Sequence, residues 1–426
     1  MTIVAIIIIL LMALLGAPLF VVILAATMLG FLSADVDLAI IAAELYRLAE
    51  TPLLLALPLF TFAGYILSES NTSTRIIRLT RVFFGWLPSG LAVVSLVACA
   101  VFTAFTGASG ITIVALGALL LPALIQEGYQ EKFSLGLVTT TGSLGLLLPP
   151  SIPLILYGII VQQMELGQKF TLPELFMAGI LPALLMIVLL ALWAAWTSRH
   201  LPLRRGAFSA AEAVAAVKEA AWELPLPVFI VVGIFGGFLT ISEVAAVTAL
   251  YVMLVETIVY KEIKAQHLIK VITDSMQMVG GILLILGVSL AFTNYLVDAQ
   301  IPMHLFEWVS ANVDSKLTFL MLLNVFLLIL GAILDIFSAL VIVVPLIVPI
   351  ALNYGVHPVH LGVIFLANMQ IGYFTPPVGM NLFIASYRFN KPITELYQAT
   401  IPFMLILLLA VLIITYVPWL STWFIR

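Results

Sequence analysis

Two stretches of the chain carry the same pattern of proline and glycine, with corresponding residues 227 positions apart. The pattern reads Pro122, Gly128, Gly145, Pro149 and Pro150 in the first stretch, and Pro349, Gly355, Gly372, Pro376 and Pro377 in the second. Each Pro-Pro pair ends one apolar run and begins another. Because proline lacks a backbone donor and clashes with the preceding helical turn, each pair predicts a helix broken near its middle. Freed backbone groups in hydrocarbon need protein, water or a ligand, so a duplicated break indicates a transporter's binding site.

Apolar sequence extends along the whole chain. Of its 426 residues, 63% are hydrophobic and only 9% are charged, against about 25% charged in a soluble domain. Segments long enough to cross a bilayer recur from end to end, which predicts an all-α polytopic membrane protein. The single cysteine, Cys99, excludes a disulfide framework, and the net charge of −4 argues against a nucleic-acid partner.

The expected spans fall into two repeats joined by a polar linker. We expect spans at 3–32, 52–68, 173–197, 223–240, 241–258, 276–297 and 402–424, and broken helices at 132–163 and 358–388. Polar or small residues interrupt two further apolar stretches, 88–126 and 317–352, which we interpret as re-entrant hairpins. The first repeat then covers residues 1–200, the linker 201–222 and the second repeat 223–426. We expect the first segment to be a retained span rather than a signal peptide, and the linker to be helical without chemistry of its own.

Lysine and arginine predict how the chain is oriented, because they favour the cytoplasmic side. Basic residues gather in segments 69–88, 198–222 and 259–275, and again after residue 387. All four basic segments lie on the same side of the membrane only if the two hairpins enter the membrane from opposite sides. The first hairpin then enters from the cytoplasm and the second from outside. The pattern therefore predicts an inverted repeat. Segments 72–84 and 261–275 are also amphipathic, and we expect both to lie along the interface.

Four polar patches interrupt the membrane segments, at the two hairpin tips and the two breaks. They contain hydroxyls, amides, glycines and one carboxylate, that of Asp335. Neutral oxygens and unwound backbone carbonyls suit Na⁺, and glycine lets the backbone approach an ion closely. We therefore expect one Na⁺ site where each tip faces a break, with the substrate between the two. An ionised Asp in a membrane is costly, so Asp335 either binds a cation or has a hydrogen-bonded structural role.

Four other residues have simpler expected roles. Glu243 lies at a turn between two spans and is expected to cap a helix. His357 and His360 lack a third ligand for a metal. Arg47 is expected to be an ordinary interfacial arginine, with contact to an anionic substrate or a partner as the alternative.

Five stretches match the motifs of a known family: FTGASGITIVALGALLLPALIQEGY, TTTGSLGLLLPPSIPLILYGI, TISEVAAV, GAILDIFSALVIVVPLIVPI and NMQIGYFTPPVGMNLFIAS. Through them the chain resembles the large membrane subunit of tripartite ATP-independent periplasmic (TRAP) transporters, over essentially its whole length. The resemblance implies an elevator-type, Na⁺-driven secondary transporter of the bacterial or archaeal inner membrane, and not an enzyme. It also implies a periplasmic binding protein that delivers an organic acid anion, and a small four-helix membrane subunit. No such four-helix domain precedes Met1, so that subunit is expected to be a separate chain.

The resemblance further implies which residues hold ions and substrate. The first Na⁺ site would use Gly107, Ser109, Thr141, Ser143 and Gly145, and the second would use Gly331, Asp335, Thr375 and Gly379. The substrate would lie between them, near Pro149, Pro150, Ser151, Asn368, Gln370, Pro376, Pro377 and Asn381. Family members usually read SSTIGPIIPPS where this chain reads TGSLGLLLPPS, so Gly142 replaces a hydroxyl residue and Leu146 a proline.

Two other classes of protein are alternatives. The nearer is a stand-alone ion-coupled carboxylate transporter of the same architecture, which needs no binding protein. The remoter is an intramembrane protease, which would need paired carboxylates, a Ser-His pair or an HExxH motif within the spans. Asp335 has no intramembrane carboxylate partner in the sequence.

Overall fold

The computed structural model describes residues 2–87, 89–164, 170–201 and 209–425. Within these ranges the chain forms helices and no strand, which confirms the expected all-α fold. Eight of the described helices are long and apolar enough to cross a membrane, and a bent pair, Glu131–Leu147 with Ile152–Gln163, raises the number to nine. Three of the four hairpin helices are among them, and the fourth, Gly90–Thr106, is apolar but one residue shorter than the others. Whether the hairpins are re-entrant stays a prediction.

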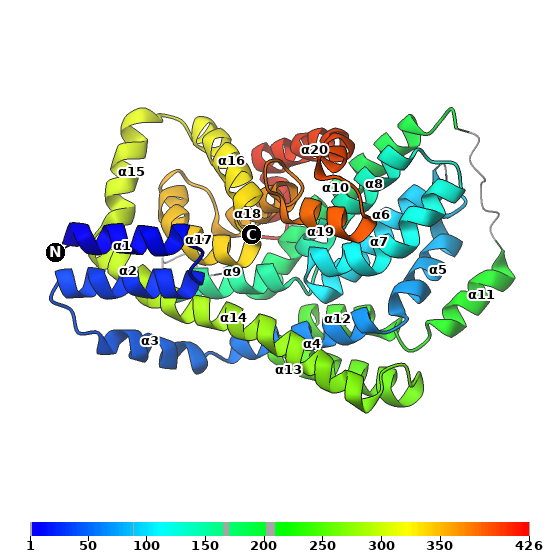
Figure 1. The fold of residues 1–426 in the computed structure, drawn as a ribbon, viewed down its shortest axis with the longest axis horizontal. Coiled ribbons are helices and arrows are strands. Elements are labelled where there is room, and N and C mark those ends of the chain that lie inside the picture. Colours follow the sequence, from blue (N-terminus) through cyan, green and yellow to red (C-terminus); the bar gives the residue numbers. More distant parts are fainter. Residues whose placement is uncertain (1, 88, 165–169, 202–208, 426) are drawn as a thin grey trace.

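The first apolar segment forms two helices instead of one span. Helices α1 (Thr2–Leu14) and α2 (Leu19–Ser33) lie side by side (Figure 1). Gly16 lies between them at φ +81°, a left-handed conformation that glycine adopts without strain. At 1.5 Å per residue each helix is roughly 20 Å long, shorter than a hydrocarbon core of about 30 Å. The predicted single span over 3–32 is therefore wrong, because the turn at Gly16 folds the segment back on itself.

One layer of helices runs along the lower side of Figure 1 and is built around α14 (Ala265–Asp298). This 34-residue helix packs against α2, α3 and α4, and α4 also packs against α13. Residues from Ala265 onward belong to one continuous helix that also contains the expected span 276–297, and the interfacial position of segment 261–275 stays a prediction. The other members of the layer are α3 (Ala39–Ala49), η1 (Pro52–Leu55), α4 (Ala56–Glu69), α12 (Pro225–Phe235), α13 (Ile241–Leu254) and the π-helical turn η3 (Val255–Val259).

Two helical hairpins and two broken helices lie above this layer and follow the 227-residue pattern. In the first half they are α6 (Gly90–Thr106), α7 (Ser109–Gln126), α8 (Glu131–Thr141), η2 (Leu144–Leu147) and α9 (Ile152–Gln163). In the second half they are α16 (Lys316–Ile333), α17 (Ile336–Asn353), α18 (Pro358–Gly372) and α19 (Met380–Phe389). The bounds of α17 are those of α7 displaced by 227 residues. Both helix breaks and both hairpin turns fall where the sequence places them, and the Pro149–Pro150 and Pro376–Pro377 bonds are cis.

The two halves interlock around these breaks. Helix α9 packs against α17, and its counterpart α19 packs against α7. In the same reciprocal way, α8 packs against α20 (Ile393–Tyr416) and α18 packs against α10 (Leu172–Thr197). Each hairpin therefore contacts a broken helix of the opposite half.

The remaining helices differ in several places from the expectations. Helix α20 begins well before residue 402 and ends before α21 (Trp419–Thr422), so the last span is shifted toward the N-terminus. Helix α15 (Ile301–Asn312) lies where we expected only a connection. The linker contains α11 (Ala210–Glu219), as expected. Arg204 and Arg205, which belong to the basic segment 198–222, lie outside the described residues.

Candidate functional site

The first hairpin tip lies directly against the first break. Thr103 Oγ1, on α6, donates a hydrogen bond to Gly142 O over 2.9 Å and lies 2.7 Å from Thr112 Oγ1 on α7. Both threonines are fully buried. A Cβ added to Gly142 would lie 3.0 Å from Ser109 O, and one added to Gly145 would lie 2.1 Å from Ala100 O. Only glycine permits these approaches, which gather hydroxyl and carbonyl oxygens where the tip meets the break.

The residues predicted for the first Na⁺ site surround this contact. Gly107 forms the turn at φ +65° and packs on Ile152. Ser109 Oγ donates to Asn381 Oδ1 over 2.8 Å. Ser143 Oγ reaches the carbonyls of Thr140 and Gln370, at 3.2 and 3.3 Å. Thr141 is less well placed, because its hydroxyl bonds to Val138 O within its own helix at 3.3 Å.

The second tip and the second break meet through backbone groups. A Cβ on Gly372 would lie 2.4 Å from the carbonyl carbon of Gly331, so the two glycines are in direct contact. The N–H of Gly379 donates to Ala332 O over 2.9 Å. Gly331 and Asp335 line a small cavity of about 220 Å³. Thr375 does not line this cavity, and its hydroxyl donates a hydrogen bond to Ile371 O over 2.8 Å.

Asp335 caps the N-terminus of α17. Its Oδ1 accepts hydrogen bonds from the N–H groups of Phe337 and Ser338, both at 3.0 Å, and its Oδ2 accepts from the Ser338 hydroxyl. The N–H of Ile336 donates to the Tyr373 hydroxyl over 2.8 Å. Of the two roles expected for Asp335, the hydrogen-bonded structural one is therefore present. The geometry leaves the other open, since a carboxylate has lone pairs beyond those used here.

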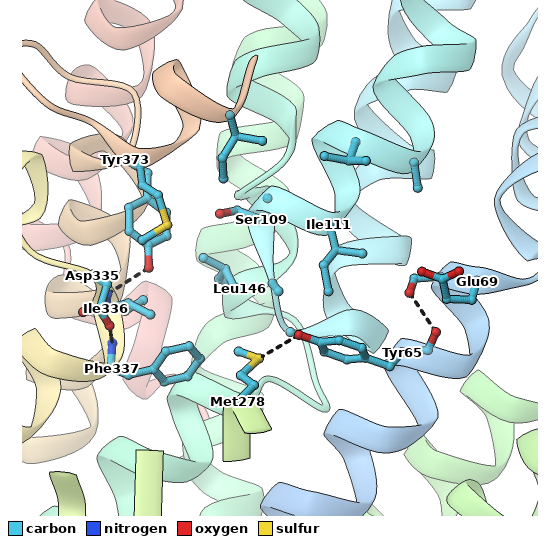
Figure 2. A pocket seen from close by; sticks show the side chains of 18 residues that line it. Tyr65, Glu69, Ser109, Ile111, Leu146, Met278, Asp335, Ile336, Phe337 and Tyr373 are labelled. Carbon is cyan, nitrogen blue, oxygen red and sulfur yellow. Dashed lines mark hydrogen bonds between the residues drawn. The ribbon is translucent and has the colours of Figure 1, made fainter. Parts of the chain in front are cut away.

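A larger cavity of about 600 Å³ separates the two tips from the lower helical layer (Figure 2). From the tips it is lined by Gly107–Ile111 and by Asp335, Ile336 and Phe337. From the lower layer it is lined by Tyr65 and Glu69 of α4 and by Met278 of α14, with Tyr65 Oη 3.4 Å from Met278 Sδ. Figure 2 shows Ser109 and Tyr373 on one side of this space and Tyr65 on the other.

The side chains that line the cavity carry negative charge only. Its lining contains the carboxylates of Glu69 and Asp335 and no lysine or arginine. Glu69 also contacts His267, with Oε2 2.8 Å from Nε2. Positive character comes instead from the N-termini of α7 and α17, both of which lie at the cavity wall.

None of the eight residues predicted to bind substrate lines the larger cavity. Ser151 caps α9, accepting from the N–H of Leu154, and Asn368 donates to Asn324 Oδ1 over 2.6 Å. Gln370 is fully buried, and neither polar atom of its side chain has a hydrogen-bond partner among the described residues. The predicted residues that do reach the cavity are Gly107, Ser109 and Asp335.

A buried charge cluster at the start of α5 (Thr72–Phe84) has no signature in the local sequence. The side chain of Arg75 is only 5% exposed and contacts three carboxylates: Glu223 at 2.6 Å, Glu262 at 2.6 Å and Glu256 at 3.4 Å. Its guanidinium also lies over the ring of Tyr260, 4.0 Å from the centroid. These partners lie far along the chain, beyond the reach of any local pattern. Glu243 does follow its pattern, since it forms a capping box with Thr240.

Paired hairpins and paired helix breaks around a shared cavity are a transporter architecture, and the comparisons identify the family. Residues 4–420 match the family described as tripartite ATP-independent periplasmic transporter, DctM component. The chain belongs to this family. It is therefore the large permease subunit of a TRAP transporter, a multi-pass membrane protein and not an enzyme.

Individual relatives agree with this assignment. The TRAP permease is 34% identical to the C4-dicarboxylate TRAP transporter large permease protein of Rhodobacter capsulatus over 409 residues, covering 93% of each chain. It is 33% identical to the corresponding protein of Vibrio cholerae, covering 92% of this chain and 89% of the relative. Among solved structures, the fold is similar to that of the Alcanivorax borkumensis YdaH transporter, with a TM-score of 0.64 at 15% identity over 90% of this chain and 88% of that one.

Proposed function

We propose that this TRAP permease couples the inward movement of Na⁺ to the import of an organic acid anion across a bacterial or archaeal inner membrane. A periplasmic binding protein delivers the anion, and a small four-helix membrane subunit braces the permease. The relatives are named for C4-dicarboxylates, isethionate, ectoine and sialic acid. These compounds share an acidic oxyanion group, and they define the panel of substrates to test.

The contact between each hairpin tip and its break carries the proposal. At the first, hydroxyl and carbonyl oxygens of Thr103, Thr112 and Gly142 lie within hydrogen-bonding distance of one another. At the second, the Gly331–Gly372 contact lies beside Asp335. Neutral oxygens with at most one carboxylate suit Na⁺ better than a transition metal. In keeping with this, the described residues contain no group of three or more His, Cys, Asp or Glu side chains placed to hold a metal.

The cavity supports an elevator movement. It separates the tips, which we place in a mobile body with the broken helices, from Tyr65 and Met278 in the lower layer. Two bound Na⁺ ions would order the tips and offset the anionic charge of the substrate, so that ion and substrate load together. Binding of Na⁺ and binding of the anion then favour each other, so the inward Na⁺ gradient drives the anion inward.

The test is uptake into proteoliposomes that contain the permease and its small subunit, with the binding protein outside. Radiolabelled succinate, N-acetylneuraminate, isethionate and ectoine are supplied with and without an inward Na⁺ gradient. We expect uptake of at least one compound that needs both the gradient and the binding protein. Uptake by the permease without the binding protein would favour a stand-alone transporter, and uptake driven by protons alone would contradict the Na⁺ sites.

A further inference from the structure

The linker between the two repeats contains a helix that lies along α5. Helices α5 and α11 pack side by side at the right of Figure 1. Arg78 of α5 contacts Glu219, the last residue of α11. Just beyond the end of α5, Trp86 lines a small pocket together with Ser209, the residue before α11. Residue numbers in α11 fall as those in α5 rise, so the two helices are antiparallel.

Helix α11 is too short to be stable by itself. It has 10 residues, and isolated helices shorter than about 12 residues are marginal in water. Ala216 is buried, whereas Val214 lies on the exposed side of the helix. Helix α5 is the element against which α11 packs. The contact with α5 therefore supplies most of the stability of α11, since short helices in proteins are stabilised by packing more than by propensity.

Arg78 makes the charged part of this contact. Its Nε and Nη2 both lie 2.8 Å from Glu212 Oε1, and its Nη1 donates to Glu219 Oε2. Glu212 lies in the first turn of α11 and Glu219 at its end, so one guanidinium holds both ends of the helix. Because these side chains are 40–49% exposed, the ion pairs add little to the stability of the whole fold. Their effect is local, on the position of α11.

The two helices also connect the lower layer to the helices above it. Along the chain, α5 leads from α4 in the lower layer to the first hairpin, and α11 leads from α10 back to α12 in the lower layer. At one end the lower layer holds both helices. Arg75 of α5 contacts Glu256 and Glu262, and Tyr260 Oη donates to Glu219 O at the end of α11 over 2.7 Å. At the other end, α5 continues into α6 and packs against it.

We propose that α5 and α11 form one two-helix arm that carries the hairpins and broken helices on the lower layer, and that Arg78 holds the two helices of this arm together. The inference rests on the proposed function in taking the hairpins and broken helices as the body that moves. A second helix bound alongside α5 stiffens it, so displacement of the body is transmitted instead of being lost in bending. Arg78 is then a positioning residue, which touches neither ion nor substrate and affects the rate of movement, not the affinity for the substrate.

Hydrogen exchange of the purified permease tests the pairing without any transport. Arg78→Met removes both ion pairs and leaves the Arg75 cluster intact, so the unfolding temperature should stay close to that of the wild type. We expect the backbone amides of residues 210–219 to exchange about fivefold faster or more, because α11 opens locally once it is no longer held. Lys218→Met is the matched control, since Lys218 is a cation on the same helix without an ion pair among the described residues.

Uptake into proteoliposomes tests the arm. Arg78→Met should import the acid about threefold more slowly at an unchanged half-saturating concentration, while Lys218→Met imports it like the wild type. A variant with both Arg78→Cys and Glu219→Cys should be equally slow, and joining its two new thiols with a bis-maleimide should restore the rate. The remaining cysteine, Cys99, is buried and should not react.

The outcomes separate this proposal from the proposed function. Unchanged exchange of α11 in Arg78→Met would overturn the pairing. Wild-type uptake by Arg78→Met, or a crosslink that leaves uptake slow, would overturn the arm. If α11 loosens as expected but the wild type imports no acid under a Na⁺ gradient, the pairing stands and the arm falls together with the proposed transport cycle.

Discussion

Arg75 provides the sharpest test of how the permease is held together. Its guanidinium is the only cation in contact with Glu223, Glu256 and Glu262 among the described residues, and Glu256 is fully buried. Burial lowers the pKa of Arg75, but hydrogen bonds to Glu223 and Glu262 outweigh this effect and hold the pKa above its ordinary value. Removing one partner of a buried ion pair leaves an uncompensated charge, at a cost of about 3–5 kcal/mol. Because a domain is typically stable by only about 5–15 kcal/mol, Arg75→Met should lose a large part of the free energy of unfolding.

The assay is unfolding of the purified permease in detergent, followed by circular dichroism over a denaturant or temperature series. Arg78→Met is the matched control on the same helix, since Arg78 also pairs with two carboxylates, Glu212 and Glu219, but is 40% exposed. It should change stability little, because exposed ion pairs contribute little. Adding Glu256→Gln to Arg75→Met should recover part of the loss by removing a buried charge. If Arg75→Met is no more destabilising than Arg78→Met, the cluster does not hold α5 in place as argued.

Three further predictions follow from the tips and from the cluster. Asp335→Asn should lower Na⁺-dependent uptake while the permease stays folded, because asparagine caps a helix about as well as aspartate; wild-type uptake would remove Asp335 from the second Na⁺ site. Gly372→Ala should destabilise the second tip by about 1–3 kcal/mol, since its Cβ would meet Gly331. Gly280→Ala is the control and should not destabilise the permease, because no atom lies within 4 Å of its Cβ position. Equal unfolding temperatures for the two variants would contradict this prediction. Burial raises the pKa of Glu262, but hydrogen bonds from Arg75 and Asn71 outweigh it and hold the pKa below the ordinary value of 4.5. Its stabilising contribution is therefore present at neutral pH and is lost as the pH falls through the lowered pKa, so the thermal unfolding of wild type and Arg75→Met should converge at pH values below that pKa.

Elements fixed by local backbone chemistry could be predicted from the sequence. The Pro-Pro pairs and the polar or small residues at the hairpin tips act on their own helices, so the breaks after Thr141 and Gly372 and the turns at Gly107 and Leu334 fall where expected. Glu243 is predictable for the same reason, because a capping box needs only residues three apart.

Features that depend on distant partners could not be predicted. Arg75 is basic and precedes a span, which indicates a solvated interfacial residue, yet its partners lie 148, 181 and 187 residues away. The fold-back at Gly16 cannot be predicted from composition, because a continuous apolar run has the same composition whether it crosses the membrane once or turns. The cavity also depends on tertiary packing, since it brings Tyr65 and Met278 opposite Ser109 and Asp335. The amides of Asn368 and Gln370, which the family resemblance implies to lie near the substrate, are outside the lining of this cavity, and their role stays a prediction.

Na⁺ coupling is the central claim, and it is tested most directly by measuring both fluxes in the same vesicles. Proteoliposomes containing the permease and its small subunit are given binding protein, radioactive sodium and the organic acid that is imported. The account predicts that Na⁺ enters together with the acid in a fixed ratio, and that neither enters at an appreciable rate without the other. Entry of the acid with no accompanying Na⁺ would contradict it.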